Sequence, residues 1–203
     1  HVVPLKTLYL FVGILFLMGV IFGAFIVNLL GEKPKADLLH YLKFFFQGLI
    51  EDNIADHSVA FQHSLGEYLK TIGLLWLLGL TVVGIPFILL YLFFKGLAIG
   101  FTVGFLVQQL SWQGFWFAFV SLAPVHFFVL PAILIISVSA IHFSLTIVRN
   151  RLIDHRGTIY PQFFSFSLLV VSFAGLLCLA ALFEAYISPW LMKEAVPHFS
   201  FLD

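Results

Sequence analysis

The sequence predicts an all-α fold: a polytopic integral membrane protein of about five transmembrane helices, with an amphipathic helical hairpin between the first two. Hydrophobic residues make up 62% of the 203 residues and charged residues only 10%, and the mean hydropathy is +1.08. These values lie far outside the range of soluble domains. No internal repeat or long linker divides the chain, so residues 1–203 are predicted to form a single membrane domain.

Five apolar runs reach the roughly 20 residues that a helix needs to cross a bilayer. They cover 8–30, 71–94, 96–123, 125–148 and 163–187. The third run is interrupted by Gln108, Gln109 and Gln113. It can cross the membrane once, with or without a bend, or dip in and return, and the sequence leaves these alternatives open.

The segment between the first two spans, 37–70, predicts an amphipathic helical hairpin at the outer interface. Apolar residues recur there at helical spacing in two sets, Leu38, Leu42, Phe45 and Leu49, then Phe61, Leu65, Tyr68 and Ile72. The polar stretch EDNIADHS suits the connection between them. Such helices can rest on lipid or on their own bundle, or dock on another protein, and spacing does not separate these modes.

Basic residues in short loops predict the orientation, because such loops stay on the cytoplasmic side. Arg149, Arg151 and Arg156 cluster between the fourth and fifth spans, and Lys95 follows the second. Both junctions are therefore predicted to be cytoplasmic. Counting back along the chain, the N-terminus lies inside and the C-terminus outside.

Glycines four residues apart predict close helix packing. Gly96, Gly100 and Gly104 share one helix face, and Gly19 and Gly23 repeat the spacing in the first span. Small residues let helix backbones approach closely in lipid. Such faces serve either a tight crossing within the chain or an oligomer such as a homodimer, and the sequence does not choose between them.

Three prolines are predicted to bend helices, because proline lacks an N–H donor and clashes with the preceding turn. Pro86 lies in the second predicted span, and Pro124 and Pro131 flank the start of the fourth. His126 stands between the latter two, and an ionisable residue in a span is a functional candidate. No Asp, Glu or Cys lies near it in sequence, so we interpret it as a residue that packs or hydrogen-bonds.

The predicted hairpin contains a pattern that could bind a metal. His63 and Glu67 stand four residues apart and share a helix face, and His57 lies earlier in the same segment. Metal sites need about three or four protein ligands in a fixed geometry. These three residues form an incomplete set that solvated helix faces often show, so no metal site is assigned.

Catalytic chemistry lacks its usual groups in this sequence. There is no Walker A motif, no G-x-S-x-G elbow and only one cysteine, so ATP hydrolysis, acyl transfer and thiol redox chemistry are not expected. The formal net charge of zero argues against a nucleic-acid partner. We expect no enzyme, no catalytic residue and no cofactor. A channel or transporter component remains the alternative, because the third span carries glycines and glutamines.

Two blocks, YLFVGILFLMGVIFGAFIVN and KGLAIGFTVGFLVQQLSWQGFWFAFVSLAP, resemble the stage II sporulation protein M family of endospore-forming Firmicutes. The resemblance covers all five predicted spans. It implies a non-enzymatic scaffold in the mother-cell membrane at the sporulation septum, with a cytoplasmic N-terminus. The implied partners are the stage II sporulation proteins P and D, which degrade septal peptidoglycan during engulfment.

If the chain recruits such partners, the outer surface should do so, because the hydrolase domains act outside the cytoplasm. That surface is the predicted hairpin and the tail from Pro189. Glu51, Asp52 and Asp56 are the candidate partner residues.

Broader relatives carry a motif like P-H-G-x-x-E-L-P-A at the place of residues 124–132. The prolines, the leucine and the alanine agree here. The His and Glu positions of the motif fall on Val125 and Val129, and its glycine position falls on His126. The role of that polar pair cannot be carried over to this chain.

Overall fold

A computed structural model describes residues 4–50, 57–149 and 160–195, and within these ranges every secondary-structure element is a helix. The helices are α1 (Leu5–Leu29), α2 (Glu32–Ile50), α3 (His57–Gly79), α4 (Gly84–Val148), α5 (Tyr160–Tyr186) and α6 (Ser188–Ala195). The predicted all-α class is confirmed. Of the described helices, α1, α4 and α5 are long and apolar enough to cross a membrane.

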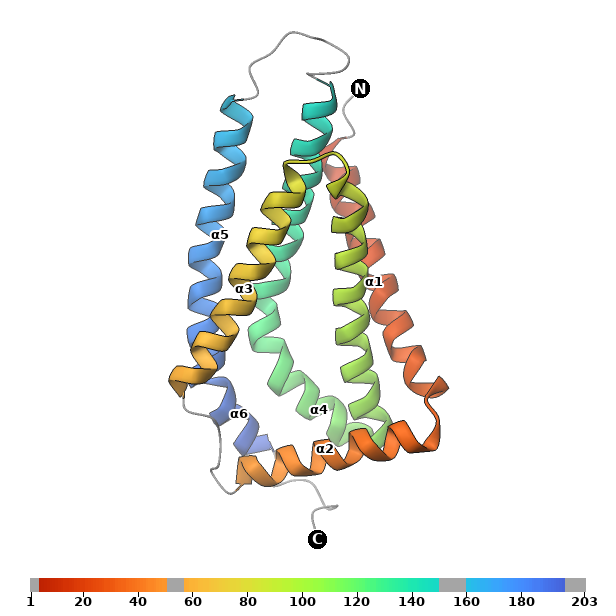
Figure 1. Ribbon diagram of the computed structural model, residues 1–203. Coiled ribbons are helices and arrows are strands. Elements are labelled where there is room, and N and C mark those ends of the chain that lie inside the picture. The colour runs from red at the N-terminus through yellow and green to blue at the C-terminus, as the bar shows by residue number, and fades with distance from the viewer. Residues whose placement is uncertain (1–3, 51–56, 150–159, 196–203) are drawn as a thin grey trace.

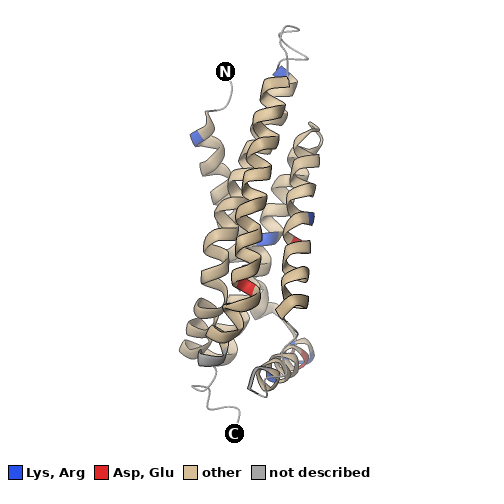
Figure 2. Ribbon diagram, turned by 90° about the vertical axis from the view of Figure 1, so that its left-hand side faces the viewer, with Lys and Arg blue, Asp and Glu red and all other residues tan. Residues whose placement is uncertain are grey.

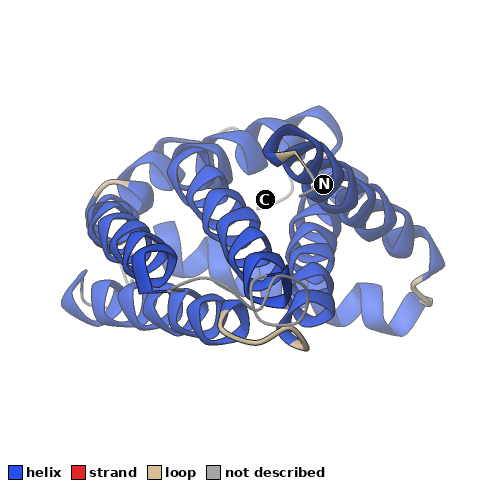
Figure 3. Ribbon diagram, turned by 90° about the horizontal axis from the view of Figure 1, so that it is seen from above, coloured by secondary structure: helices blue, strands red, loops and turns tan. Residues whose placement is uncertain are grey.

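The helices form an elongated bundle in which α1, α3, α4 and α5 run lengthwise (Figure 1). α2 lies across the end of the bundle where α1 stops and α3 begins, and α6 lies at the same end. Charged residues are sparse along the lengthwise helices and gather on α2 (Figure 2). Seen from above, the helices pack around one another (Figure 3). This distribution fits an apolar bundle in a bilayer with α2 at one interface.

α4 is too long for one crossing and reverses direction in its middle (Figure 1). Its 65 residues would extend roughly 98 Å if straight, against about 30 Å of hydrocarbon. Ser111 breaks the helix with φ 53° and ψ −131°. The first segment, 84–110, and the second segment, 112–148, therefore fold back along each other. Gly114 permits this reversal, because a Cβ there would collide with the Leu106 carbonyl.

The predicted glycine faces hold α1 against the first segment of α4. A Cβ on Gly19 or Gly23 would strike backbone atoms of α4, and a Cβ on Gly96 or Gly100 would strike backbone atoms of α1. At Gly104 the added atom would lie 2.9 Å from a Cα of α1. These contacts use the small residues for a crossing within the chain, which leaves them unavailable as an oligomer face.

α3, the second segment of α4 and α5 form the rest of the core. Gly79, at the end of α3, lies so close to Ala140 and Phe166 that an added Cβ would come within 2.8 Å and 3.0 Å of their side chains. One turn earlier on α3, the Trp76 Nε1–H donates to the Ser167 hydroxyl at 3.1 Å. Apolar contact and one half-buried hydrogen bond thus join three segments that are distant in sequence.

The hairpin predicted over 37–70 is wrong in its second half. α2 is the amphipathic helix that the spacing indicates, and it is anchored by the fully buried Phe46, whose ring lies edge-on to that of Phe117 at 5.0 Å. α3 does not end near residue 70. It continues lengthwise to Gly79 because its apolar face stays buried through Ile72 and Leu75.

The span predicted over 71–94 is also wrong, because the chain turns at residues 80–83. The sharpness of this turn requires Gly84, where a Cβ would collide with the Leu78 carbonyl. The Thr81 carbonyl accepts a hydrogen bond of 2.9 Å from Ser144, which fixes the turn to the second segment of α4. The run 96–123 likewise contains the break at Ser111, where the chain folds back, so it does not form a single crossing.

The three prolines do not produce the reversals of the chain. Pro86 occupies the third position of α4, where its missing N–H is not needed, so the bend predicted there is absent. The helix continues through Pro124 and Pro131, and its non-helical residue is Ser111. Lys95 lies inside the first segment of α4 rather than at the junction that we predicted.

Candidate functional site

Polar side chains from α3, α4 and α5 meet inside the bundle, where these helices are otherwise largely apolar. We call this set the polar cluster: Tyr68, Thr71, Tyr91, Lys95, His126 and Glu184. All of its members are half-buried. Ionisable residues within a membrane bundle are costly and usually face its interior, which makes this cluster the first candidate for a site.

The strongest contact of the cluster joins α3 to α5. The Tyr68 hydroxyl donates to the Glu184 carboxylate at 2.5 Å, across 116 residues of sequence. A hydrogen bond to an ionised group is shorter and stronger than a neutral one. The phenol thus partly replaces the water that the carboxylate loses on entering the bundle.

The start of α3 is fixed to the same part of α5. The His57 Nδ1–H donates to the Ala185 carbonyl at 2.9 Å, and its ring stacks on Tyr186 with a centroid separation of 5.3 Å. This arrangement places the imidazole one residue from Glu184 along α5. The N-terminal end of α3 is therefore held against the C-terminal end of α5.

Lys95 and His126 bring the two segments of α4 into the cluster. Lys95 and Glu184 both act electrostatically on the imidazole of His126. The ring Nδ1–H donates to the Leu122 carbonyl one turn earlier at 2.9 Å, so the neutral ring keeps Nε2 as an acceptor. The sequence interpretation of His126 as a hydrogen-bonded residue fits this geometry, but its charged neighbours come from the fold.

A second hydrogen bond of the cluster links α3 to the first segment of α4. Thr71 and Tyr91 share a hydrogen bond of 3.1 Å between their hydroxyls, and Tyr91 stands one turn before Lys95. The cluster therefore contains two hydrogen bonds between helices, Thr71–Tyr91 and Tyr68–Glu184, and Lys95 and His126 join it electrostatically. Such a series can hold helices in register, and it can also accept and release protons or a small ion.

The structure does not bring the metal candidates together. His57 is engaged with α5, as described above, whereas His63 is exposed and Glu67 pairs with Lys70 on the surface at 3.4 Å. Within the described ranges no three His, Cys, Asp or Glu side chains could hold a metal ion between them.

The candidate partner residues Glu51, Asp52 and Asp56 lie outside the described residues. The helix that precedes them, α2, presents Tyr41 and Phe44 with 72% of each side chain exposed. At the same end of the bundle, α6 exposes Trp190.

Sequence reasoning missed Lys95 and Glu184 as members of a common site. Lys95 served only as a loop marker, and Glu184 lies near the end of the span predicted over 163–187. The signal that could have found them is the position of each charge within an apolar run, since a buried charge needs a partner from another helix.

Comparison with known protein families assigns this chain to a family. The family model described as stage II sporulation protein M matches residues 12–189. No curated protein and no solved structure matches the chain. The match covers most of the sequence, and all of α1 to α5 except the first turns of α1. This all-helical chain with its apolar, membrane-length helices therefore belongs to the stage II sporulation protein M family of sporulation-related membrane proteins.

Proposed function

We propose that this protein is a non-enzymatic membrane scaffold that recruits and localises peptidoglycan-degrading partners at the sporulation septum during engulfment. The observation that carries the proposal is the family match over residues 12–189. The partners would be the stage II sporulation proteins P and D. The protein would sit in the septal and engulfing mother-cell membrane, where those hydrolases act.

In this proposal the chain crosses the membrane five times, through α1, α3, the two segments of α4, and α5. The lengthwise course of these segments supports the arrangement (Figure 1). The start of α1 and Arg149 lie at one end of the bundle, and basic residues favour the cytoplasmic side. The N-terminus would then be cytoplasmic, and α2, α6 and the C-terminus would face outward.

The outer end of the bundle would carry recruitment. α2 and α6 lie there, and their exposed Tyr41, Phe44 and Trp190 are the aromatic residues that protein interfaces favour. Glu51, Asp52 and Asp56 follow α2 directly in the sequence and would add charge to this surface.

Copurification from sporulating cells tests the proposal. Tagged protein should retain proteins P and D, and reversal of Glu51, Asp52 and Asp56 to Lys should weaken that retention and the septal localisation of the hydrolases. Reversal of Glu32 and Asp37, at the other end of α2, is the matched control. Retention of neither partner by the unmodified chain would disprove the scaffold role.

A channel or transporter component is the second candidate, because the polar cluster places titratable groups inside an apolar bundle. Protein reconstituted in vesicles should then pass protons or a small ion, and Glu184→Gln should abolish the flux while leaving copurification intact. Vesicles without any flux above the lipid background would exclude this candidate.

A further inference from the structure

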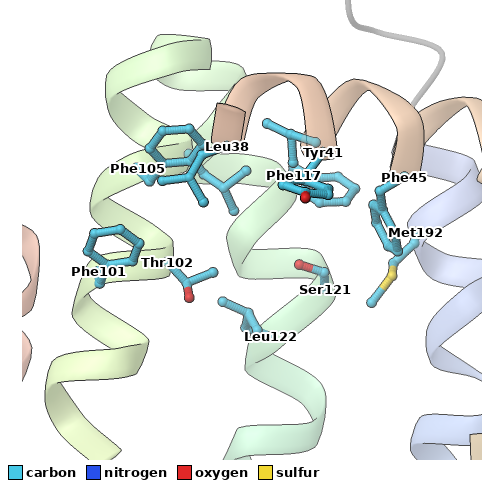
Figure 4. Close-up of a pocket in the computed structure, with 12 residues that line it drawn as sticks. Leu38, Tyr41, Phe45, Phe101, Thr102, Phe105, Phe117, Ser121, Leu122 and Met192 are labelled. Carbon is cyan, nitrogen blue, oxygen red and sulfur yellow. The ribbon is translucent and has the colours of Figure 1, made fainter. Parts of the chain in front are cut away.

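An apolar cavity of about 410 Å³ lies beneath α2 (Figure 4). α2 covers it, the two segments of α4 form its walls, and α6 contributes one side chain, Met192. Its lining residues are Leu38, Tyr41, Leu42, Phe45, Phe101, Thr102, Phe105, Leu106, Phe117, Ser121, Leu122 and Met192. The space is larger than the ~150 Å³ of an apolar cavity that accepts benzene.

The hydroxyl groups in the cavity wall offer few hydrogen bonds to a water molecule. The Thr102 hydroxyl donates to the Ala98 carbonyl at 3.0 Å, and the Ser121 hydroxyl donates to the Ala118 carbonyl at 3.4 Å. A buried water needs two to four polar partners. The remaining lining is aliphatic and aromatic apart from the Tyr41 phenol, so the favourable occupant is apolar.

The cavity opens sideways onto the surface of the bundle. Thr102 is exposed although it lines the wall, and Phe45, in the roof, is 48% exposed. The wall helix α4 is one of the helices apolar enough to cross a membrane. The molecules that meet such an opening in a bilayer are lipids, and their acyl chains have the required chemistry.

Positive charge on α2 lies where a lipid headgroup would be. α2 carries Lys33, Lys35 and Lys43 against two acids, Glu32 and Asp37. Lys35 stands one turn before Leu38, on the side of α2 that faces the cavity. Basic residues on an interfacial amphipathic helix attract anionic headgroups.

We propose that the cavity beneath α2 binds one acyl chain of an anionic phospholipid, whose phosphate lies at Lys35. The bound chain would fill the space between α2 and the break of α4 and so hold α2 at its angle across the bundle. Lipid binding at this site requires neither the proposed partners nor ion flux, although α2 and its Tyr41 also belong to the proposed recruitment surface.

Native mass spectrometry of the purified full-length chain, with phosphatidylglycerol or phosphatidylcholine of identical acyl chains added, tests the site. One phosphatidylglycerol should remain bound at activation energies that strip the others. Thr102→Trp, which places an indole in the cavity mouth, should lower this occupancy about tenfold. Leu17→Trp, on an exposed part of α1, is the matched control and should retain the lipid.

Lys35→Gln separates the headgroup from the acyl chain. It should reduce the preference for phosphatidylglycerol over phosphatidylcholine several-fold while one lipid still binds. An unchanged preference would overturn the assignment of the phosphate to Lys35.

Photoreactive acyl chains locate the lipid in the unmodified protein, so a misfolded variant cannot obscure the result. Phosphatidylglycerol with a diazirine in its chain should label Phe117 or Leu122 more than Leu17. Uniform labelling of exposed apolar surfaces would overturn the proposal. Retention of the lipid by Thr102→Trp would also overturn it. A copurified protein segment that crosslinks to the cavity lining in place of lipid would do the same.

Discussion

At the scale of single residues, the reversal of α4 depends on a serine in a conformation that favours glycine. Ser111 has φ 53° and ψ −131°, and it is the one residue with positive φ among the described residues other than glycine. Side chains with a Cβ are strained there, at a cost of about 1–3 kcal/mol. Glycine populates this region without that cost.

Ser111→Gly should therefore stabilise the protein and raise its melting temperature in detergent by a few degrees, because about 1 kcal/mol shifts a chain of this size by roughly 2–4 °C. Ser172→Gly is the control. It lies inside α5, where glycine weakens a helix, and should lower the melting temperature. Destabilisation by Ser111→Gly would show that the reversal lies elsewhere.

The hydrogen bonds of the polar cluster also depend on single residues, because Tyr68 and Thr71 on α3 bond to Glu184 on α5 and to Tyr91 on α4. If the Tyr68 hydroxyl is removed, the Glu184 carboxylate stays half-buried and loses its hydrogen-bond donor. Leaving a charged group without its hydrogen bond costs more than removing both partners together.

Tyr68→Phe should lower the free energy of unfolding by roughly 1.5–3 kcal/mol. In the Glu184→Gln background the same change should cost clearly less, because the charged acceptor is gone. Thermal unfolding of the two single variants and the double variant measures this coupling. Tyr186→Phe, on an exposed tyrosine, should have little effect, and additive costs for the pair would refute the interaction.

At the scale of elements, the crossing of α1 with the first segment of α4 holds the N-terminal part of the bundle together. Backbone carbonyls of each helix occupy the space that a side chain would take at glycines of the other. Helices in lipid associate through such packing, because burial of apolar surface gives no advantage over contact with lipid tails. This crossing should therefore tolerate no added side chain.

Gly100→Leu should separate α1 from α4 and cost roughly 1–3 kcal/mol or more. Gly175→Leu on α5 makes the same change where no atom lies within 4 Å of an added Cβ, and should be nearly neutral. Protease sensitivity and thermal unfolding of the two variants in detergent compare them. Equal stability would mean that the close crossing does not form.

At the scale of the whole molecule, the break in α4 decides which residues share a side of the membrane. Arg149 and the turn at 80–83 lie at the end of the bundle where α1 begins, whereas residues near Ser111 lie at the opposite end, with α2 (Figure 1). A straight helix through 96–123 would change which of these residues lie at the same end of the bundle. The topology is thus a direct test of the fold.

Cysteine accessibility, in a variant that carries Cys178→Ser, shows on which side of the membrane each end of the bundle lies. Val83→Cys and Arg149→Cys should react with a membrane-impermeant reagent only in inverted vesicles, and Trp112→Cys only in intact cells. Val83 and Trp112 are well exposed, so poor access cannot explain a negative result. Labelling of Trp112→Cys and Arg149→Cys from one side would contradict the break at Ser111.

Composition and local periodicity are enough to predict the all-helical membrane class, the amphipathic character of α2 and the residues of the glycine crossing. These properties depend on composition and on the local 3.6-residue period, which any single helix displays. The sequence also indicated the family, through blocks that lie in α1 and α4.

Contacts between distant segments set where the chain turns and which polar residues lie together. Hydropathy placed helix ends at Lys95 and near residue 70, because a charge in an apolar run reads as a boundary. In the fold, Lys95 stays inside α4, where its charge acts on His126, and α3 stays helical past Lys70 because its apolar face packs on α4 and α5. A buried charge is stabilised by partners from distant segments, and spacing along one helix cannot show which partners the fold supplies.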